Sequence, residues 1–149
     1  MISLLRDAHE LVCRWVTKQT TTTGLSGISG GHKCIGVLKD NHLVAGFVYH
    51  DWNPSFGTIH MTLAAEAPKW ASRGVIHELL AYPFETCKCQ RITVNVDESN
   101  AKSLRLAEGV GFRAEAYHER AASDGGCMVT LRLFIEEWRA GRYYKGVTN

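Results

Sequence analysis

The segment from Arg91 to Phe112, written RITVNVDESNAKSLRLAEGVGF, limits the folds open to this chain more than any other stretch. Its first seven residues alternate between apolar and polar side chains, and the apolar positions are Ile92, Val94 and Val96. A period of two and an enrichment in β-branched residues are typical of a β-strand. The segment is therefore predicted to begin with a strand.

A helix is predicted to follow this strand. Ser99 or Asn100 is a suitable N-cap, because both residue types accept hydrogen bonds from the free amides of a first helical turn. The apolar residues of the helix recur at a spacing of three and are Leu104, Ala107 and Val110. Gly109 and Gly111 indicate its end, since glycine readily adopts the left-handed conformation that closes many helices. Phe112 begins the next predicted strand.

Three further strands precede this segment, over Lys33–Leu38, Leu43–His50 and Thr58–Ala65. Short turns at 40–41 and 53–57 separate them, which predicts an antiparallel meander. An apolar pattern then predicts a helix over about Ala71–Glu85. Because a strand, a helix and a strand in this order require a crossover, Thr58–Ala65 and Arg91–Asp97 are expected to be neighbouring parallel strands with a right-handed connection.

The two ends of the chain carry further elements. An apolar stripe predicts an N-terminal helix of about four turns, formed by Leu4, Leu5, Ala8, Leu11, Val12, Trp15 and Val16. Such a stripe usually packs on the sheet of its own domain, although a partner-binding surface fits the same pattern. Thr20–Gly31, rich in Thr, Gly and Ser, is predicted to be a mobile loop. The last third is predicted to hold strands and then a charged closing segment, over Phe112–Ala116, Tyr117–Ala121, Cys127–Leu133 and Phe134–Arg142.

The composition fits one domain over residues 1–149. Of the 149 residues, 45% are hydrophobic, enough for a core without metal or disulfide bonds. A formal net charge of +2 argues against a dedicated nucleic-acid-binding surface and leaves a polyanion partner open. No signal-peptide core and no run of membrane-spanning length is present in the sequence, so we expect a cytoplasmic protein without a membrane partner.

The cysteines argue against a metal site. Five are present, an odd number that favours reduced thiols in a cytoplasmic protein. Cys87 and Cys89 are separated by one residue, whereas structural zinc sites use a spacing of two or more, and no second pair completes four ligands. We therefore expect no structural zinc.

The start of the helix after Thr58–Ala65 is a candidate anion site. The first amides of a helix lack partners inside the helix, and its dipole places partial positive charge there, so this end attracts an anion such as a pyrophosphate. Lys69 and Arg73 add full positive charges. An ordinary helix start is the alternative interpretation.

The predicted helix after the strand contains the pattern N-x-x-S, an apolar stripe and G-F, formed by Asn100, Ser103, Leu106, Gly111 and Phe112. This pattern resembles the last motif of the GNAT superfamily of acyl-CoA N-acyltransferases. Tyr-Pro-Phe at 82–84 and Glu-Trp at 137–138 resemble the branch that contains the ribosomal-protein N-terminal acetyltransferases and short bacterial and phage relatives. The resemblance extends from about Val44 to Trp138 and implies a single-domain α/β (α+β) GNAT fold. Its mixed central sheet of about six to seven strands would contain a parallel splayed pair with flanking helices.

The resemblance also implies acetyl-CoA as the acyl donor. Backbone groups of Thr62, Leu63 and Ala64 would contact its pantetheine, and an amide there would polarise the thioester carbonyl. The remaining cofactor-binding residues would be Lys69, Trp70, Ser72, Arg73, Gly74 and Asn100. The family's phosphate-binding turn is usually Q/R-x-x-G-x-G/A, and here lysine and serine replace two of its residues. The loop Thr20–Gly31 would border the acceptor site.

Direct attack by an amine needs a proton acceptor and a donor to the departing sulfur. Most relatives carry a tyrosine acid where this chain has Ala107, so the resemblance implies Ser103 as the donor. The alternative is a helix serine that bonds back to a carbonyl. The candidate base is His60, whose free pKa of about 6.5 suits proton uptake, with a structural histidine as the alternative. The reserve candidates are His50, Asp51 and Glu119.

Two functions from different classes are consistent with the sequence. The first is N-acetylation of a primary amine on a protein α-amino group or a small molecule. The second is a non-catalytic GNAT-fold protein that binds acyl-CoA or a protein partner, which the absent tyrosine and the altered phosphate turn favour. A homodimer is compatible with both functions.

Overall fold

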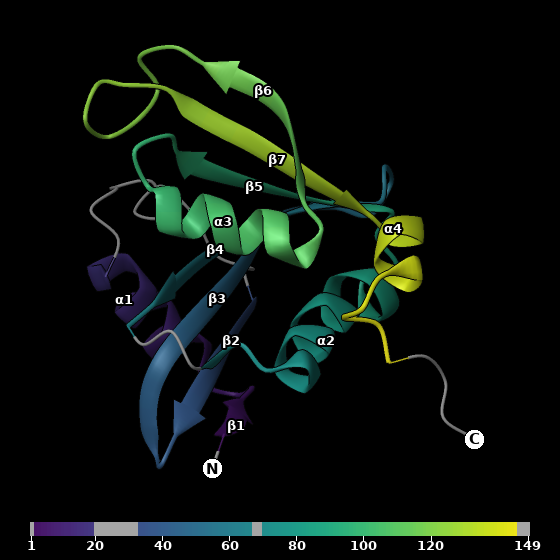
Figure 1. Cartoon of the computed structure of the whole chain (residues 1–149). Coiled ribbons are helices and arrows are strands. Elements are labelled where there is room, and N and C mark those ends of the chain that lie inside the picture. Colours follow the sequence, from purple (N-terminus) through teal and green to yellow (C-terminus); the bar gives the residue numbers. More distant parts are fainter. Residues whose placement is uncertain (1, 20–32, 67–69, 146–149) are drawn as a thin grey trace.

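The structure, a computed structural model, describes residues 2–19, 33–66 and 70–145 and contains a seven-stranded mixed sheet with helices on both faces (Figure 1). The strands, in spatial order β1-β2-β3-β4-β5-β7-β6, are β1 (Ile2–Leu5), β2 (Lys33–Lys39), β3 (His42–Asn53), β4 (Thr58–Ala65), β5 (Arg91–Asp97), β6 (Arg113–His118) and β7 (Met128–Phe134). The helices are α1 (His9–Gln19), α2 (Arg73–Ala81), the π-helix η3 (Tyr82–Thr86), α3 (Ala101–Val110) and α4 (Ile135–Ala140). The predicted fold class is confirmed.

The predicted antiparallel meander is confirmed as β2, β3 and β4. Asp40 and Asn41, between β2 and β3, have φ angles of 51° and 68°. Two left-handed residues in a two-residue hairpin are typical of a type I′ turn, for which aspartate and asparagine are well suited. The observed bounds of β4 are those predicted from the sequence.

The crossover from β4 to β5 consists of α2 and η3, and the two strands are parallel as predicted. α2 begins at its N-cap Ser72, whose Oγ accepts a hydrogen bond from the Val75 amide at 3.2 Å. The buried face of α2 consists of Val75, Ile76, Leu79 and Leu80. Pro83, which has no N–H to donate, lies in η3, where the helical hydrogen bonding changes.

The helices are divided between the two faces of the sheet, with α3 in front of it and α1 behind it in Figure 1. α1 packs on β2, β3 and β4 through the fully buried Val12 and Val16. The larger core lies on the opposite face, under α2, α3 and α4. There the Phe84 ring stacks on Trp138 of α4 at 5.2 Å between centroids, so two motifs distant in the sequence meet.

Two sequence predictions are wrong. Leu4 and Leu5, which the apolar stripe predicts to begin the N-terminal helix, belong to β1, which pairs with β2, and α1 begins only at His9. The reason is tertiary: the edge of β2 offers backbone hydrogen bonds that local helix propensity cannot outweigh. Tyr117–Ala121 is not a separate strand, because β6 continues to His118 along β7 past an irregularity at Ala114 and Ala116. The predicted loop Thr20–Gly31 lies outside the described residues.

α1 approaches the sheet closely because two glycines face it. Gly36 and Gly46 are opposite each other on β2 and β3. A methyl group on Gly46 would lie 2.6 Å from Val16 Cγ2 and 3.1 Å from Val12 Cγ1, below normal contact distances.

Within the described ranges, no helix is long and apolar enough to cross a lipid bilayer.

We expect Gly46→Ala to lower the free energy of unfolding by about 1–3 kcal/mol, because the added methyl group overpacks the contact with α1. Gly109→Ala is the matched control. Gly109 is exposed inside α3 with nothing within 4 Å of an added methyl group, so alanine there should stabilise by about 0.5–1 kcal/mol. Urea unfolding of both variants measures the two effects. Equal effects of the two changes would contradict this packing account.

Candidate active site

β4 and β5 pair over only three positions and then separate. The paired residues are Thr58 with Arg91, Ile59 with Ile92 and His60 with Thr93. Beyond them β4 continues along β3 and β5 continues along β7, so the inner edges of β4 and β5 diverge (Figure 1). A cavity of about 790 Å³ opens at this split. Inner-edge backbone groups beyond the last pair are free to bind an extended ligand.

One side of the cavity, facing α2 and α3, is apolar. It is formed by members of the large core, including Phe47, Met61, Trp70, Ile76, Leu79, Val94 and Ala107. Trp70 is buried and packs edge-on against Phe47, with ring centroids 5.2 Å apart. A side of this kind suits a flexible, mostly apolar chain.

The opposite side of the cavity is polar. Thr62 and Ala64 lie two residues apart on β4 and therefore share one face, on which Ala64 packs against α1. Thr62 lines the cavity together with His50 and Asp51. His50 lies between the other two, with Nδ1 2.6 Å from Asp51 Oδ2 and Nε2 2.8 Å from Thr62 Oγ1. The hydrogen bond from His50 lowers the pKa of the Asp51 carboxyl, so it is the ionised partner at neutral pH.

His60 lies next to this group, and it is not among the described residues that line the cavity. It pairs with His50 across β3 and β4, and the two rings are 5.7 Å apart. Burial lowers the pKa of His60, and electrostatic interactions with His50 and Arg91 lower it further, while Asp51 acts in the opposite direction. His60 is therefore neutral over a wider pH range than an exposed histidine.

The first turn of α3 brings a hydroxyl to the cavity. Asn100 is the N-cap, and its Oδ1 accepts a hydrogen bond from the Ser103 amide at 3.2 Å. Ser103 lines the cavity and is half-buried. Within the part of the chain that the structure describes, its hydroxyl has no hydrogen-bond partner, so it is available to a ligand. Ala107, one turn later, is buried and has no group to donate.

The predicted phosphate-binding turn is only partly described, because Lys69 lies outside the described residues. Trp70 lines the cavity, whereas Ser72, Arg73 and Gly74 are not among the residues that line it. The Ser72 hydroxyl caps α2, and Arg73 is exposed beside it. The amides of Arg73 and Gly74 have no partner inside the helix, since they belong to its first turn.

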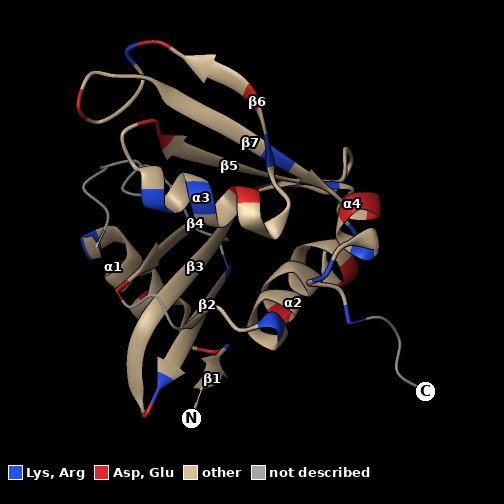
Figure 2. Ribbon diagram, in the orientation of Figure 1, with Lys and Arg blue, Asp and Glu red and all other residues tan. Residues whose placement is uncertain are grey.

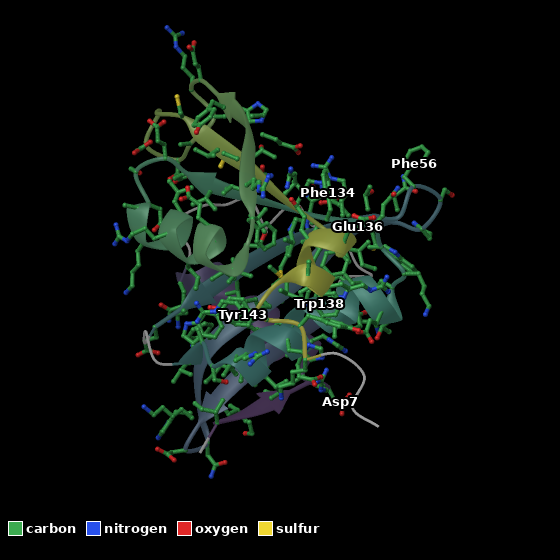
Figure 3. All side chains as sticks on the ribbon, turned by 45° about the vertical axis from the view of Figure 1, so that its right-hand side comes forward. Asp7, Phe56, Phe134, Glu136, Trp138 and Tyr143 are labelled. Carbon is green, nitrogen blue, oxygen red and sulfur yellow. The ribbon has the colours of Figure 1, made fainter. Side chains whose placement is uncertain are left out.

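A second cation reaches this turn from the end of the chain. A methyl group on Gly74 would lie 3.0 Å from Lys145 Nζ, so this ammonium lies beside the first turn of α2. The Lys145 amide donates to His77 Nδ1 at 3.1 Å, and the Tyr144 ring packs on Trp138 at 4.8 Å. Figure 3 labels Trp138 on α4 and Tyr143 on the segment that follows this helix. Sequence reasoning missed Lys145, because it is far from Gly74 in the chain and belongs to no motif.

Metal-binding and thiolate chemistry are weakly represented among the described residues. They contain no group of three or more His, Cys, Asp or Glu side chains that could hold a metal ion. Burial raises the pKa of Cys34 to about 12 and that of Cys89 to about 11, so neither is a ready thiolate at neutral pH. Acidic and basic residues are interspersed along the elements in Figure 2.

Solved structures share this architecture. Spermidine/spermine N-acetyltransferase SpeG from Vibrio cholerae, in glutamate-to-glutamine mutant forms, is 12% identical and has a TM-score of 0.73 over 94% of this chain and 98% of its own. A protein described as a probable acetyltransferase is 22% identical, with a TM-score of 0.61 over 72% of this chain and 64% of its own. No protein-family model matches the sequence, and no curated protein matches it. The chain thus has the GNAT acetyltransferase fold.

The lowered pKa of His60 predicts a pH dependence of stability. Above the unfolded-state pKa of about 6.5 the histidine is neutral in both states. As the pH falls below that value, the unfolded chain takes up the proton first, so the folded state loses stability until the pH reaches the lowered folded pKa. In His60→Gln, unfolding free energies measured between pH 7.5 and 5 should fall less than in the wild type. An equal fall in both proteins would contradict the predicted shift.

Proposed function

We infer that this protein transfers an acetyl group from acetyl-CoA to a primary amine by direct attack. The observation that carries the proposal is the cavity at the β4–β5 split, which joins an apolar wall to a polar wall. A thioester bound between them would present its carbonyl to an amine arriving from the polar side. The acetyltransferase fold of the structural neighbours supports this choice of reaction.

Pantetheine would lie between the diverging inner edges of β4 and β5. Its amides would bond to backbone groups near Thr62, Leu63 and Ala64, as edge strands bind extended ligands. A free N–H on this edge would also stabilise the oxyanion of the tetrahedral intermediate. The phosphates would lie at the first turn of α2, near Arg73 and the ammonium of Lys145.

Ser103 is the proposed donor to the departing thiolate. Its hydroxyl comes from the helix on the apolar side, where the pantetheine chain would end, and Asn100 fixes the first turn that presents it. A serine donor at 103, with alanine at the position of the usual tyrosine, also supports the proposed relation to the ribosomal-protein N-terminal acetyltransferase branch. The acceptor would then be a protein α-amino group or a small amine.

A non-catalytic acyl-CoA-binding protein is the second candidate. The observation that favours it is Ser72, whose hydroxyl is engaged by the Val75 amide where the family usually has glycine. Both candidates bind acetyl-CoA, so only turnover separates them. Release of the CoA thiol that depends on an added amine supports the enzyme. Tight binding without release for any amine in a broad panel supports the second candidate.

Charge reversal tests the phosphate site. We expect Arg73→Glu and Lys145→Glu each to weaken CoA binding about tenfold, close to 1.4 kcal/mol, since each loses an attraction to phosphate and adds a repulsion. Pantetheine, which lacks the phosphates of CoA, should bind these variants and the wild type equally. Lys39→Glu, an exposed reversal at the far end of β2, is the control for net charge. Calorimetry giving the same CoA affinity for all three variants would refute this placement.

Ser103→Ala should lower kcat by about tenfold or more while the Kd for acetyl-CoA changes little. The reason is that a donor to sulfur matters chiefly when negative charge develops in the transition state. Ser55→Ala, at an exposed hairpin, is the matched control. Steady-state kinetics together with calorimetry separate the two effects. An unchanged kcat would remove Ser103 from the mechanism.

A further inference from the structure

We propose that Thr62, His50 and Asp51 form a relay that removes the proton of the acceptor amine. The proposal rests on the acetyl transfer inferred above and names the base for it. All three side chains line the cavity on its polar side, where an acceptor would enter. They form one continuous chain, Thr62 Oγ1 to His50 Nε2 at 2.8 Å and His50 Nδ1 to Asp51 Oδ2 at 2.6 Å.

The ionised carboxylate of Asp51 fixes the direction of this chain. A carboxylate can only accept a hydrogen bond, so the proton of neutral His50 must be on Nδ1. Nε2 is then the acceptor and receives the hydroxyl proton of Thr62. A hydroxyl bonded to a basic nitrogen that a carboxylate orients is the arrangement enzymes use to move protons.

The backbone of β3 is shaped to make this contact. Asp51 has a φ angle of 53°, in the left-handed region that aspartate tolerates better than most residues. The register of β3 with β4 shifts between His50 and Asn53, so the strand is irregular at this residue. An irregularity of this kind re-aims side chains, and here neighbouring residues of one strand bring carboxylate and imidazole together. Strained backbone of this kind is concentrated at functional sites.

Thr62 is the member of the chain closest to the reaction. It lies two residues beyond His60, the last residue of β4 that pairs with β5, so it lies at the opening of the split. Its hydroxyl is on the polar side, whereas Ser103 comes from α3 on the apolar side. The amine and the departing sulfur would thus meet different proton-transfer groups on opposite sides of the thioester.

Every proton in the step is accounted for by the relay residues, Ser103 and solvent. As the amine nitrogen bonds to the thioester carbon, an N–H proton passes to the Thr62 oxygen, and the Thr62 proton passes to His50 Nε2. The C–S bond then breaks, and the thiolate takes a proton from Ser103, which is reprotonated from solvent. His50, now an imidazolium beside Asp51, returns its proton to solvent. Amine and acetyl-CoA thereby become amide and free CoA thiol.

Several other titratable or charged groups lie near His50. His60 on β4 faces it at 5.7 Å, Asp51 follows it on β3, and Arg91 on β5 acts through its charge on His60. His118 and Thr130 provide an internal comparison. His118 Nε2 and Thr130 Oγ1 are also hydrogen-bonded, at 3.0 Å, but neither residue lines the cavity, and within the described residues His118 has no hydrogen bond to a carboxylate.

The kinetic test uses wild type and variants with acetyl-CoA and three probes: spermidine, a peptide with a free α-amine and a peptide with one lysine. CoA thiol release is the readout. For an accepted probe, His50→Gln should lower kcat by roughly 10²- to 10⁴-fold, the range for a general base. Asp51→Asn and Thr62→Val should also lower kcat, Thr62→Ser should restore it, and the control His118→Gln should keep wild-type values. No release with the wild type would count against the proposed function.

The tautomer of His50 tests the relay without turnover. Proton–nitrogen correlation spectra of the uniformly ¹⁵N-labelled protein at pH 7.5, with the His50 signals assigned from their loss in His50→Gln, should show protonated Nδ1 and unprotonated Nε2. Asp51→Asn should weaken this preference. A protonated Nε2 in the wild type would overturn the relay. So would full activity of His50→Gln with an accepted probe, or an acetyl group on Thr62, found by mass spectrometry, that forms and decays as fast as turnover.

Discussion

The early separation of β4 from β5 is the constraint on which the rest of the structure depends. Beyond the last shared pair, β4 stays paired with β3 and β5 stays paired with β7, so the divergence leaves the inner edges of the two strands without each other's hydrogen bonds. The natural twist of strands makes such a divergence easy once the shared ladder ends. Inner-edge backbone groups are thereby left for a ligand, and the cavity forms between them.

Strand alternation then gives the cavity two different sides. Along β4, Met61 and Leu63 point toward the large core, while Thr62 and Ala64 point toward α1. One short strand thus supplies an apolar surface, where the pantetheine chain is proposed to bind, and a polar surface, where the acceptor is proposed to enter. α1 packs on this second face at β2, β3 and β4. The same face continues on β5 and β7 with polar residues, among them Thr130, which donates a hydrogen bond to Asn95.

The closing segment of the chain connects the core to the start of α2. Trp138 stacks on Phe84 and packs against Tyr144, which holds the residues after α4 beside His77. That packing positions the Lys145 ammonium near Gly74. The proposed phosphate turn, with serine in place of glycine, would in this way be supplemented by a cation from elsewhere in the chain.

The sequence alone determined the meander and the crossover, because residue periodicity and turn residues act over a few neighbours. It limited the N-cap of α3 to Ser99 or Asn100, and the structure identifies Asn100 as the cap. The sequence also placed Thr62, Leu63, Trp70 and Ser103, which do line the cavity. The tertiary structure alone decided that the N-terminal residues form β1, since an open strand edge outweighs local propensity. The tertiary structure also decided which histidine lines the cavity. Strand alternation puts His50 and His60 on the same face of the sheet. They differ because the backbone is irregular after His50 and because His60 lies where β4 is still paired with β5.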